Sequence, residues 1–179
     1  ASGRQLHALA HNRDPRAVRR RARRRSIGAQ RALGARGRDP VEVQAALMTV
    51  VDRVARRLRA AARAARTVVL RLRFDDFARA TRSQTMPEAT TRTATLLRVA
   101  RGLLHAAQPL IQSRGLTLIG VALTNLCDRA AIQLVLPFDR MAELDRTLDE
   151  LRERFGSGIV ARATLVGRDA APWVPLLPD

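Results

Sequence analysis

The chain has 179 residues, 46% of them apolar and only 3% aromatic, and its formal net charge is +17. This apolar content excludes a wholly disordered chain, and the scarcity of aromatic rings excludes a surface that stacks several bases of single-stranded nucleic acid. All 33 basic residues are arginines, and residues 1–138 hold 27 of them against 8 acidic residues. We therefore expect a polyanionic partner for residues 1–138, and a different role for residues 139–179, where 6 arginines face 8 acidic residues.

The cysteine, the apolar runs and the histidines of the chain each exclude a class of protein or site. Cys127 is the single cysteine, which excludes a disulfide framework and a cysteine-based zinc site and fits a reducing compartment. No apolar run reaches about 18 residues, and the N-terminus is polar and basic, so we expect a soluble cytoplasmic protein without membrane contact. His7 and His11 lie one helical turn apart, but no third ligand is near them, so we expect no metal site.

Two segments precede the first strand. Ser2 and Gln5 form a capping-box pattern at the start of a helix that is too short to be stable alone, so we expect it to be the end of a domain that begins upstream. Asp14-Pro15 ends this helix. The run Arg16–Arg25 repels itself, which predicts an extended linker that also contacts nucleic acid; a localisation signal and a plain solvated linker are the alternatives.

A strand and a long helix come next. Ser26–Leu33 is a strand candidate, in which Gly28 allows another backbone or a phosphate to approach closely. Asp39 as N-cap and Pro40 at the first helical position predict the start of a helix. Apolar residues then recur every three or four positions, which predicts an amphipathic helix that ends near Ala65 and covers a sheet; a helix on a membrane surface is the alternative.

The stretch Arg66–Pro87 predicts a β-hairpin. Apolar residues occupy every second position from Val68 to Phe74, the period of a strand with one buried face, and Asp75 and Asp76 suit the turn. The opposite face would carry guanidinium and hydroxyl groups, which donate hydrogen bonds to phosphate oxygens. These groups belong to Arg71, Arg73, Arg79, Thr81 and Ser83. An ordinary solvated sheet face is the alternative interpretation.

A second helix and a fourth strand complete the pattern. Pro87 is expected to end the hairpin, Thr90 or Thr91 to cap the helix and Gly115 to stop it, and Leu116–Leu126 is the next strand candidate. The order β, α, β, β, α, β predicts an α+β fold of the ferredoxin-like split type. In this arrangement, two helices cover one face of a four-stranded antiparallel sheet and leave the other face open.

The chain continues beyond this fold. Asp128–Ala131 is expected to be a connector, and the apolar segment Ile132–Phe138 follows it. A helix is expected over Arg140–Phe155 with Gly156 as its stop, and Ile159–Val166 is a candidate for one further strand. The apolar side of the helix consists of Met141, Leu144, Leu148 and Leu151.

Several motifs, taken in their order and spacing, resemble the little finger domain of Y-family DNA polymerases of the DinB type, the DNA polymerase IV group. They are Arg23–Gly28, the β-α-β-β-α-β order, Thr81–Pro87 and Leu118–Val121. The resemblance implies that residues 1–18 end a thumb domain, 19–25 are the basic linker, 26–127 are the little finger and 128–179 are a C-terminal tail.

In this family the little finger lies along the major groove of the primer-template duplex and grips the backbone of both strands, with little reading of sequence. By position, the matching residues are Arg23, Arg24, Arg25 and Ser26 in the linker and Arg82, Ser83, Gln84 and Thr85 in the hairpin. Gln84 stands where some members carry a basic residue. The resemblance thus adds to the phosphate-binding face expected from the hairpin alone.

Residues 133–138, QLVLPF, resemble the sliding-clamp binding peptide of bacterial polymerases. In that peptide a glutamine, a leucine and a final hydrophobic pair fill a pocket on the clamp. The corresponding residues are Gln133, Leu134, Leu136 and Phe138, and Pro137 between the last two matches the longer variant of the motif. An ordinary strand end is the alternative interpretation.

Catalytic residues are not expected in this chain. Family polymerases transfer nucleotides with two metal ions held by palm carboxylates, so Mg²⁺ is expected in a palm domain and no cofactor here. Asp75 and Asp76 are adjacent, but they suit the hairpin turn, where Asp bonds to nearby backbone.

Three functions follow as hypotheses. The first is the C-terminal part of an error-prone translesion DNA polymerase, a monomer in the bacterial nucleoid that binds primer-template DNA and the sliding clamp. The second is a non-catalytic, ImuB-like paralogue with the same little finger. The third is a free-standing basic module that binds structured RNA or DNA.

Overall fold

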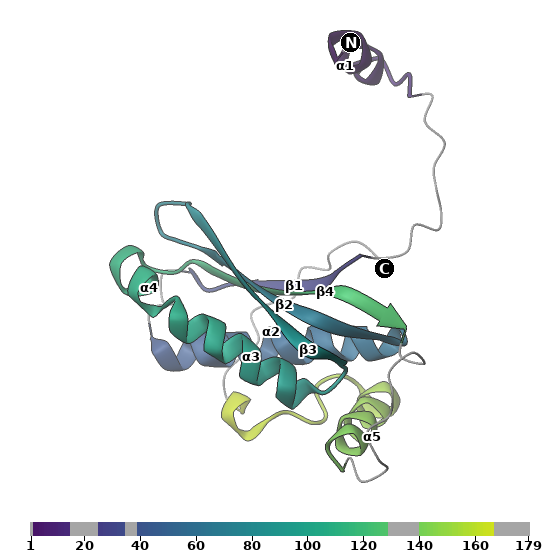
Figure 1. Cartoon of the computed structure of the whole chain (residues 1–179), viewed down its shortest axis with the longest axis vertical. Helices are drawn as coiled ribbons and strands as arrows, with labels where there is room; N and C mark the ends of the chain where they lie inside the picture. Colours follow the sequence, from purple (N-terminus) through teal and green to yellow (C-terminus); the bar gives the residue numbers. More distant parts are fainter. Residues whose placement is uncertain (1, 15–24, 35–38, 129–139, 167–179) are drawn as a thin grey trace.

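The structure, a computed structural model, describes residues 2–14, 25–34, 39–128 and 140–166. The expected β-α-β-β-α-β order is confirmed (Figure 1). Its elements are β1 (Ile27–Ala32), α2 (Pro40–Ala60), β2 (Arg63–Arg73), β3 (Arg79–Thr90), α3 (Thr93–Ala106) and β4 (Leu118–Asp128). The helix α1 (Ser2–Ala10) precedes them, and α4 (Gln108–Arg114), α5 (Arg140–Phe155) and the 3-10 helix η3 (Ala163–Leu165) complete the described chain.

The four strands form one antiparallel sheet in the order β1-β4-β2-β3. Strand β4 therefore lies between β1 and β2, which is the split arrangement that the sequence predicted. Helix α2 packs on β1, β4 and β2, and α3 packs on β2 and β3, so both helices lie on the same side of the sheet (Figure 1). The other side, which we call the open face, is the one that neither α2 nor α3 covers.

The core lies between the sheet and the two helices. Alternate residues of the central strands point into it and are at most 2% exposed: Val68, Leu70, Leu72, Ile119, Val121 and Leu123. Leu47, Val54 and Leu58 of α2 meet them and are fully buried. This aliphatic packing confirms the period-two pattern from which the hairpin was predicted.

Helix α2 begins as expected but ends earlier. The carboxylate of Asp39 accepts a hydrogen bond from the Val41 amide at 2.9 Å, and Pro40 occupies the first turn. The helix ends at Ala60 rather than near Ala65, because Ala62 turns the chain with a φ of 51° and β2 starts at Arg63. Pairing of this alanine-rich segment with β4 overrides its helical propensity.

Pro87 does not end the hairpin, because β3 continues to Thr90. Thr67 pairs with Thr85, whereas Ala65 pairs with Thr90, so β3 bulges between these two pairs. A proline, which has no amide proton, is tolerated at such a bulge on an edge strand.

The start of α3 is also different from the expectation. Its N-cap is Arg92, without a side-chain cap, and neither Thr90 nor Thr91 takes that role. The Thr93 amide instead donates to the carboxylate of Asp145 in α5, at 2.8 Å. A residue 52 positions away therefore caps this helix, which no local pattern indicates.

Helix α5 has the expected bounds, but its apolar side is not its buried side. Leu144 is 50% exposed and Leu151 is 37% exposed, whereas Asp145 and Arg152 are buried. The helix packs on α2 through ion pairs of Asp145 and Asp149 with Arg59 and of Arg152 with Asp52. Ile159–Val166 is not a strand: Gly156 turns the chain, the Val160 carbonyl accepts from Arg152 at 3.1 Å, and η3 follows.

Two glycines allow a test of this fold, because one has a backbone conformation that only glycine adopts readily and the other lies within a regular helix. Gly115 has a φ of 68° and a ψ of 178°, a region that is essentially restricted to glycine, and a Cβ there would overlap the carboxylate of Asp75. Gly102 lies in α3, and a Cβ there would meet no atom within 4 Å. Gly115→Ala is expected to lower the free energy of unfolding by about 2 kcal/mol. Gly102→Ala is expected to raise it by about 0.5 to 1 kcal/mol.

Urea unfolding of both variants measures this difference. Shifts of the same sign would contradict the backbone assignment at one of the two glycines.

Candidate nucleic-acid interface

The open face carries a row of basic and hydroxyl side chains on the hairpin. Residues that are directly opposite in an antiparallel pair share a face, and the register pairs Arg71 with Thr81, Arg73 with Arg79 and Val69 with Ser83. Since Leu70 and Leu72 point into the core, these pairs point away from the helices. Arg71, Arg79, Thr81, Ser83 and Thr85 are exposed, and Arg73 is half-buried.

Beside these arginines, small residues occupy several positions of the open face. Gly28 of β1 is opposite Ala122 of β4, and Gly120 is opposite both Gln30 and Arg71. A Cβ on Gly28 would lie 3.2 Å from the Val121 carbonyl oxygen, and one on Gly120 would lie 3.1 Å from the Cβ of Gln30. Gly28 thus permits the close approach of another backbone, which is one of the two roles expected for it.

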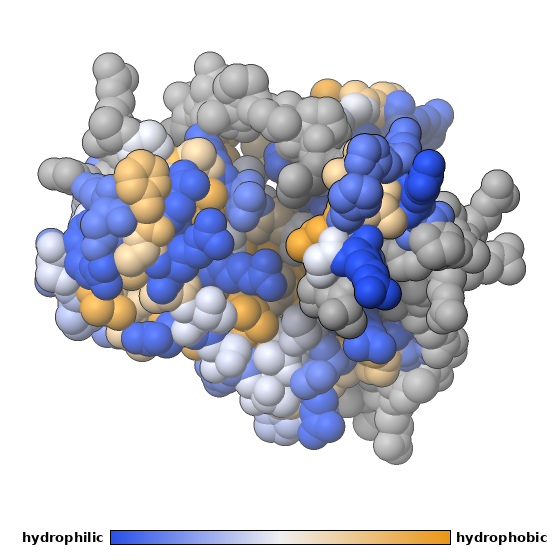
Figure 2. Space-filling view, turned by 90° about the horizontal axis from the view of Figure 1, so that it is seen from above, coloured by the Kyte–Doolittle hydropathy of each residue, from blue (hydrophilic) through white to orange (hydrophobic). Residues whose placement is uncertain are grey.

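This small-residue surface gives an extended ligand direct access to the backbone beside the hairpin arginines. Figure 2 shows the molecule from above, the side of the open face, and hydrophilic residues cover much of its described surface. Small residues with guanidinium and hydroxyl donors beside them suit a polyphosphate backbone, because such contacts need donors and access but no pocket.

Two of the residues expected to bind DNA lie on the other side of the sheet. Arg82 is opposite Leu70 and Gln84 is opposite Val68, so both side chains point toward the side that carries the helices. Both are exposed, because β3 is an edge strand. The structure thus divides the family-matched stretch: Ser83 and Thr85 lie on the open face, and Arg82 and Gln84 lie behind it at the edge.

A row of polar side chains crosses three strands at the end of the open face away from the hairpin turn. The Asn125 amide of β4 donates to the Thr67 hydroxyl of β2 at 2.9 Å, and the hydroxyls of Thr67 and Thr85 are 2.9 Å apart. Asn125 has a φ of 51°, a conformation that asparagine tolerates better than most residues. No role was predicted for Thr67 or Asn125 from the sequence. The one signal for this row in the sequence is Asn125 itself, a polar residue within the apolar strand candidate Leu116–Leu126.

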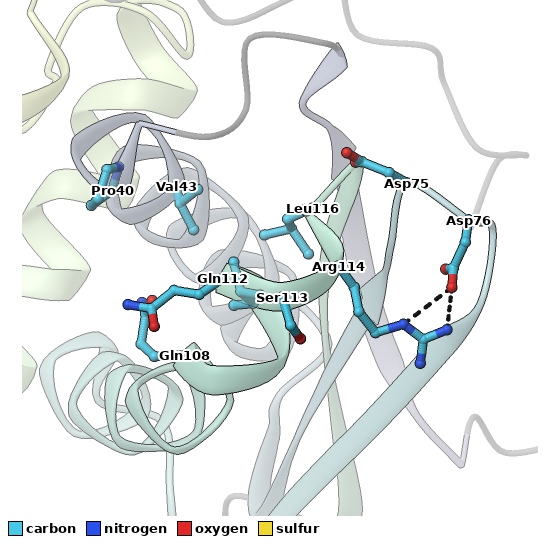
Figure 3. A pocket seen from close by; sticks show the side chains of 11 residues that line it. Pro40, Val43, Asp75, Asp76, Gln108, Gln112, Ser113, Arg114 and Leu116 are labelled. Atoms are coloured by element: carbon cyan, nitrogen blue, oxygen red, sulfur yellow. Dashed lines mark hydrogen bonds and ion pairs between the residues drawn. The ribbon is translucent and has the colours of Figure 1, made fainter.

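Asp75 and Asp76 lie at the hairpin turn, as expected, and serve the fold. Asp76 accepts from the Ala78 amide at 3.0 Å. It also accepts from Arg114 Nε at 3.1 Å, as Figure 3 shows. The hydrogen bond from Arg114 lowers the pKa of Asp76 below its ordinary value, so this carboxylate is ionised at neutral pH. The pair borders a pocket of about 560 Å³ that Gln108 and Gln112 also line.

A second group of arginines lies where α2 meets β1. Burial lowers the pKa of Arg53, and the charges of Arg56, Arg31 and Arg57 lower it further. Arg57 donates to the Gly28 carbonyl at 2.9 Å and so links the helix to the edge strand. This concentration of positive charge beside β1 adds to the potential that attracts a polyanion.

Only some of the remaining predicted site residues lie within the part of the chain that the structure describes. Arg25 and Ser26 are exposed at the start of the domain, whereas Arg23, Arg24 and the peptide Gln133–Phe138 lie outside the described residues. Among the described residues, no group of three His, Cys, Asp or Glu side chains could hold a metal ion. Within the same residues, no helix is long and apolar enough to cross a membrane.

Comparisons with known proteins add the following. Residues 24–136 match the model of the impB/mucB/samB family C-terminal domain. The chain is 38% identical to DNA polymerase IV 2 of Mesorhizobium japonicum over 193 residues, which cover 98% of this chain and 46% of that protein. It is 34% identical to DNA polymerase IV of Moorella thermoacetica over 141 residues, which cover 78% of this chain and 35% of that protein. The chain spans less than half the length of these relatives.

Solved structures with the same fold include a post-insertion binary complex of Dbh DNA polymerase, with a TM-score of 0.53 and 16% identity over 71% of this chain and 36% of that one. A DinB family error-prone DNA polymerase from Sulfolobus solfataricus has a TM-score of 0.52 and 16% identity, over 71% of this chain and 37% of that one. At this identity the likeness concerns the fold alone.

Proposed function

Because this chain belongs to the impB/mucB/samB family, whose C-terminal domain its residues 24–136 form, we propose that it is the DNA-gripping part of a DNA polymerase IV. The observation that carries the proposal is the open face, where Arg71, Arg73 and Arg79 lie beside small residues of β1 and β4. The homologous relatives named DNA polymerase IV support the assignment of the whole protein to the Y family.

The chemistry of the open face favours the phosphate backbone over the bases as its ligand. Guanidinium groups bind phosphate oxygens with charge-assisted hydrogen bonds, and the hydroxyls of Thr81, Ser83 and Thr85 can donate further bonds. Such contacts carry no sequence information. The open face of this chain would therefore hold a primer-template duplex at any sequence, which is what a polymerase that moves along DNA needs.

The nucleotidyl transfer itself is assigned to a palm domain outside these 179 residues. Two Mg²⁺ ions held by carboxylates stabilise the attacking and leaving oxygens in such reactions. The described residues do not fit this role, since no group of three His, Cys, Asp or Glu side chains among them could hold a metal ion and Asp76 is engaged at the hairpin turn. Primer extension by the full-length gene product would separate an active translesion polymerase from a non-catalytic, ImuB-like relative.

The affinity of the chain for duplex DNA at increasing salt concentration tests the proposed DNA grip. If the chain neutralises about five phosphates, the logarithm of the association constant should fall with the logarithm of the salt concentration with a slope of about −4.5. The affinity should be the same for duplexes of unrelated sequence. A slope near zero would contradict the proposal, and a preference for structured RNA over duplex DNA would favour a free-standing RNA-binding module.

We further propose that Gln133–Phe138 recruits a sliding clamp. The peptide would place Leu134, Leu136 and Phe138 in a hydrophobic pocket of the clamp, with Gln133 as the polar anchor. Deleting residues 133–138 is expected to abolish clamp binding, measured by surface plasmon resonance, and to leave the affinity for duplex DNA unchanged. Equal loss of both affinities would mean that the peptide is part of the folded domain.

A further inference from the structure

The polar row on the open face has a defined direction of hydrogen bonding. Asn125 Nδ2 can only donate, so the hydroxyl oxygen of Thr67 accepts from it at 2.9 Å. Thr67 is 7% exposed, and Thr85 Oγ1 is its one other side-chain partner among the described residues. If Thr85 donated to Thr67, the proton of the buried Thr67 hydroxyl would have no acceptor, which is costly. Thr67 therefore donates to Thr85.

This direction determines what Thr85 can offer to a ligand. A threonine hydroxyl has a single proton, and the Thr85 oxygen already accepts the proton of Thr67. The Thr85 proton is consequently free to point outward from the exposed edge strand. Consecutive hydrogen bonds also polarise one another, so the terminal hydroxyl becomes a better donor than an isolated one.

The backbone supports this arrangement from both sides. Arg63 donates to the carbonyls of Leu126 at 2.7 Å and Cys127 at 3.1 Å, which holds the segment that follows Asn125. Arg66 donates to the Met86 carbonyl at 3.0 Å and so holds the bulge that follows Thr85. Both ends of the polar row are thus fixed by arginines that do not belong to it.

We propose that Asn125, Thr67 and Thr85 form a hydrogen-bond relay that presents the Thr85 proton to a phosphate oxygen of duplex DNA. The inference rests on the proposed DNA-binding function and adds two positioning residues, Thr67 and Asn125, neither of which touches the ligand. The hairpin arginines supply charge, whereas the relay supplies an oriented neutral donor six residues along β3 from Arg79, the first residue of that strand.

Four variants of the chain test the relay by their affinity for a duplex at several salt concentrations. Thr85→Val is expected to weaken binding about tenfold and Thr67→Val about fivefold, since a hydrogen bond to a charged group is lost or weakened. Thr67→Ser keeps the hydroxyl and should bind like the unmodified chain. Asn125→Gly removes the amide while tolerating the positive φ, and it should weaken binding about as much as Thr67→Val.

Two readouts separate the relay from a merely structural role of Thr67. The slope against salt should stay unchanged in Thr67→Val and Thr85→Val, because a neutral hydroxyl releases no counterion. The double variant should bind no more weakly than Thr85→Val alone, because both changes interrupt the same relay. Thr147→Val, which removes an exposed threonine hydroxyl of α5 rather than one of the open face, is the matched control for the loss of a threonine hydroxyl.

The outcomes distinguish the two proposals. Steep salt dependence in the unmodified chain with no effect of Thr67→Val, or with losses that add in the double variant, would overturn the relay alone. Absence of salt-dependent duplex binding in the unmodified chain would overturn the proposed function and the relay with it.

Discussion

Replacing Arg71, Arg73 and Arg79 together with alanine is expected to lower the steepness of the salt dependence of duplex binding by about 2.7 units. Each guanidinium that contacts a phosphate contributes about 0.9 to the slope. If the affinities are equal at 1 M salt, the variant should bind about 500-fold more weakly than the unmodified chain at 0.1 M. Fluorescence anisotropy with a labelled duplex would measure both quantities.

The matched control removes the same charge from the other side of the molecule. Arg98 and Arg101 of α3 and Arg154 of α5 are exposed and lie on helices rather than on the open face. Their replacement with alanine should change the slope much less, because distant charges are screened beyond about 10 Å. Equal losses in both triple variants would mean that net charge, rather than the open face, determines binding.

Replacing Arg59 with methionine is expected to lower the free energy of unfolding by about 3 kcal/mol and to release α5. The Arg59 side chain is only 9% exposed and donates to both carboxylate oxygens of Asp149, at 2.6 and 2.9 Å. It also lies 3.4 Å from Asp145 and donates to the Thr91 carbonyl at 3.1 Å and to Thr93 Oγ1 at 2.9 Å. Methionine would leave two carboxylates near each other without this cation.

The protonation of Arg59 supports its use as the anchor of α5. Burial disfavours its charged form, but the hydrogen bond and charge of Asp149, with Asp145 and Asp52, outweigh this and raise its pKa above the ordinary value of an arginine. A raised pKa means that the contribution of Arg59 to stability is fully present below the ordinary pKa of arginine and is lost only as the pH rises through the higher pKa of the folded state. The anchor therefore holds throughout the physiological range.

Urea unfolding and the rate of proteolysis within α5 would measure these effects. Arg146→Met is the control. Arg146 lies on α5 itself, and its Nε is 3.8 Å from a carboxylate oxygen of Glu150 in an exposed pair. An exposed pair contributes well under 1 kcal/mol. Similar losses for Arg59→Met and Arg146→Met would contradict the anchoring role of Arg59.

The anchoring of α5 leaves the open face accessible. A second ion pair, between Arg152 and Asp52 at 2.9 Å, joins α5 to the same helix α2. Because α2 lies on the helical side of the sheet, α5 also lies there (Figure 1). The described part of the C-terminal segment thus packs opposite the surface proposed to hold DNA.

Local patterns were sufficient to predict the order of the elements and one face of the sheet. The alternation from Val68 to Phe74 indicated which side of β2 is buried, and Asp39 with Pro40 indicated the start of α2. These features depend on the residue itself and on its near neighbours, through side-chain direction and backbone dihedrals. The family resemblance, which rested on ordered motifs, is confirmed by the match of residues 24–136.

Only the tertiary structure decided the features that depend on partners far away in the chain. The register of β2 and β3 placed Arg82 and Gln84 behind the open face, and the bulge in β3 accommodated Pro87. The sequence indicated an apolar side of α5, but the helix packs through Asp145 and Asp149 because the buried Arg59 needs an anionic partner. Periodicity shows which residues share a face, but which cation lies opposite that face is determined by the packing of segments distant in sequence.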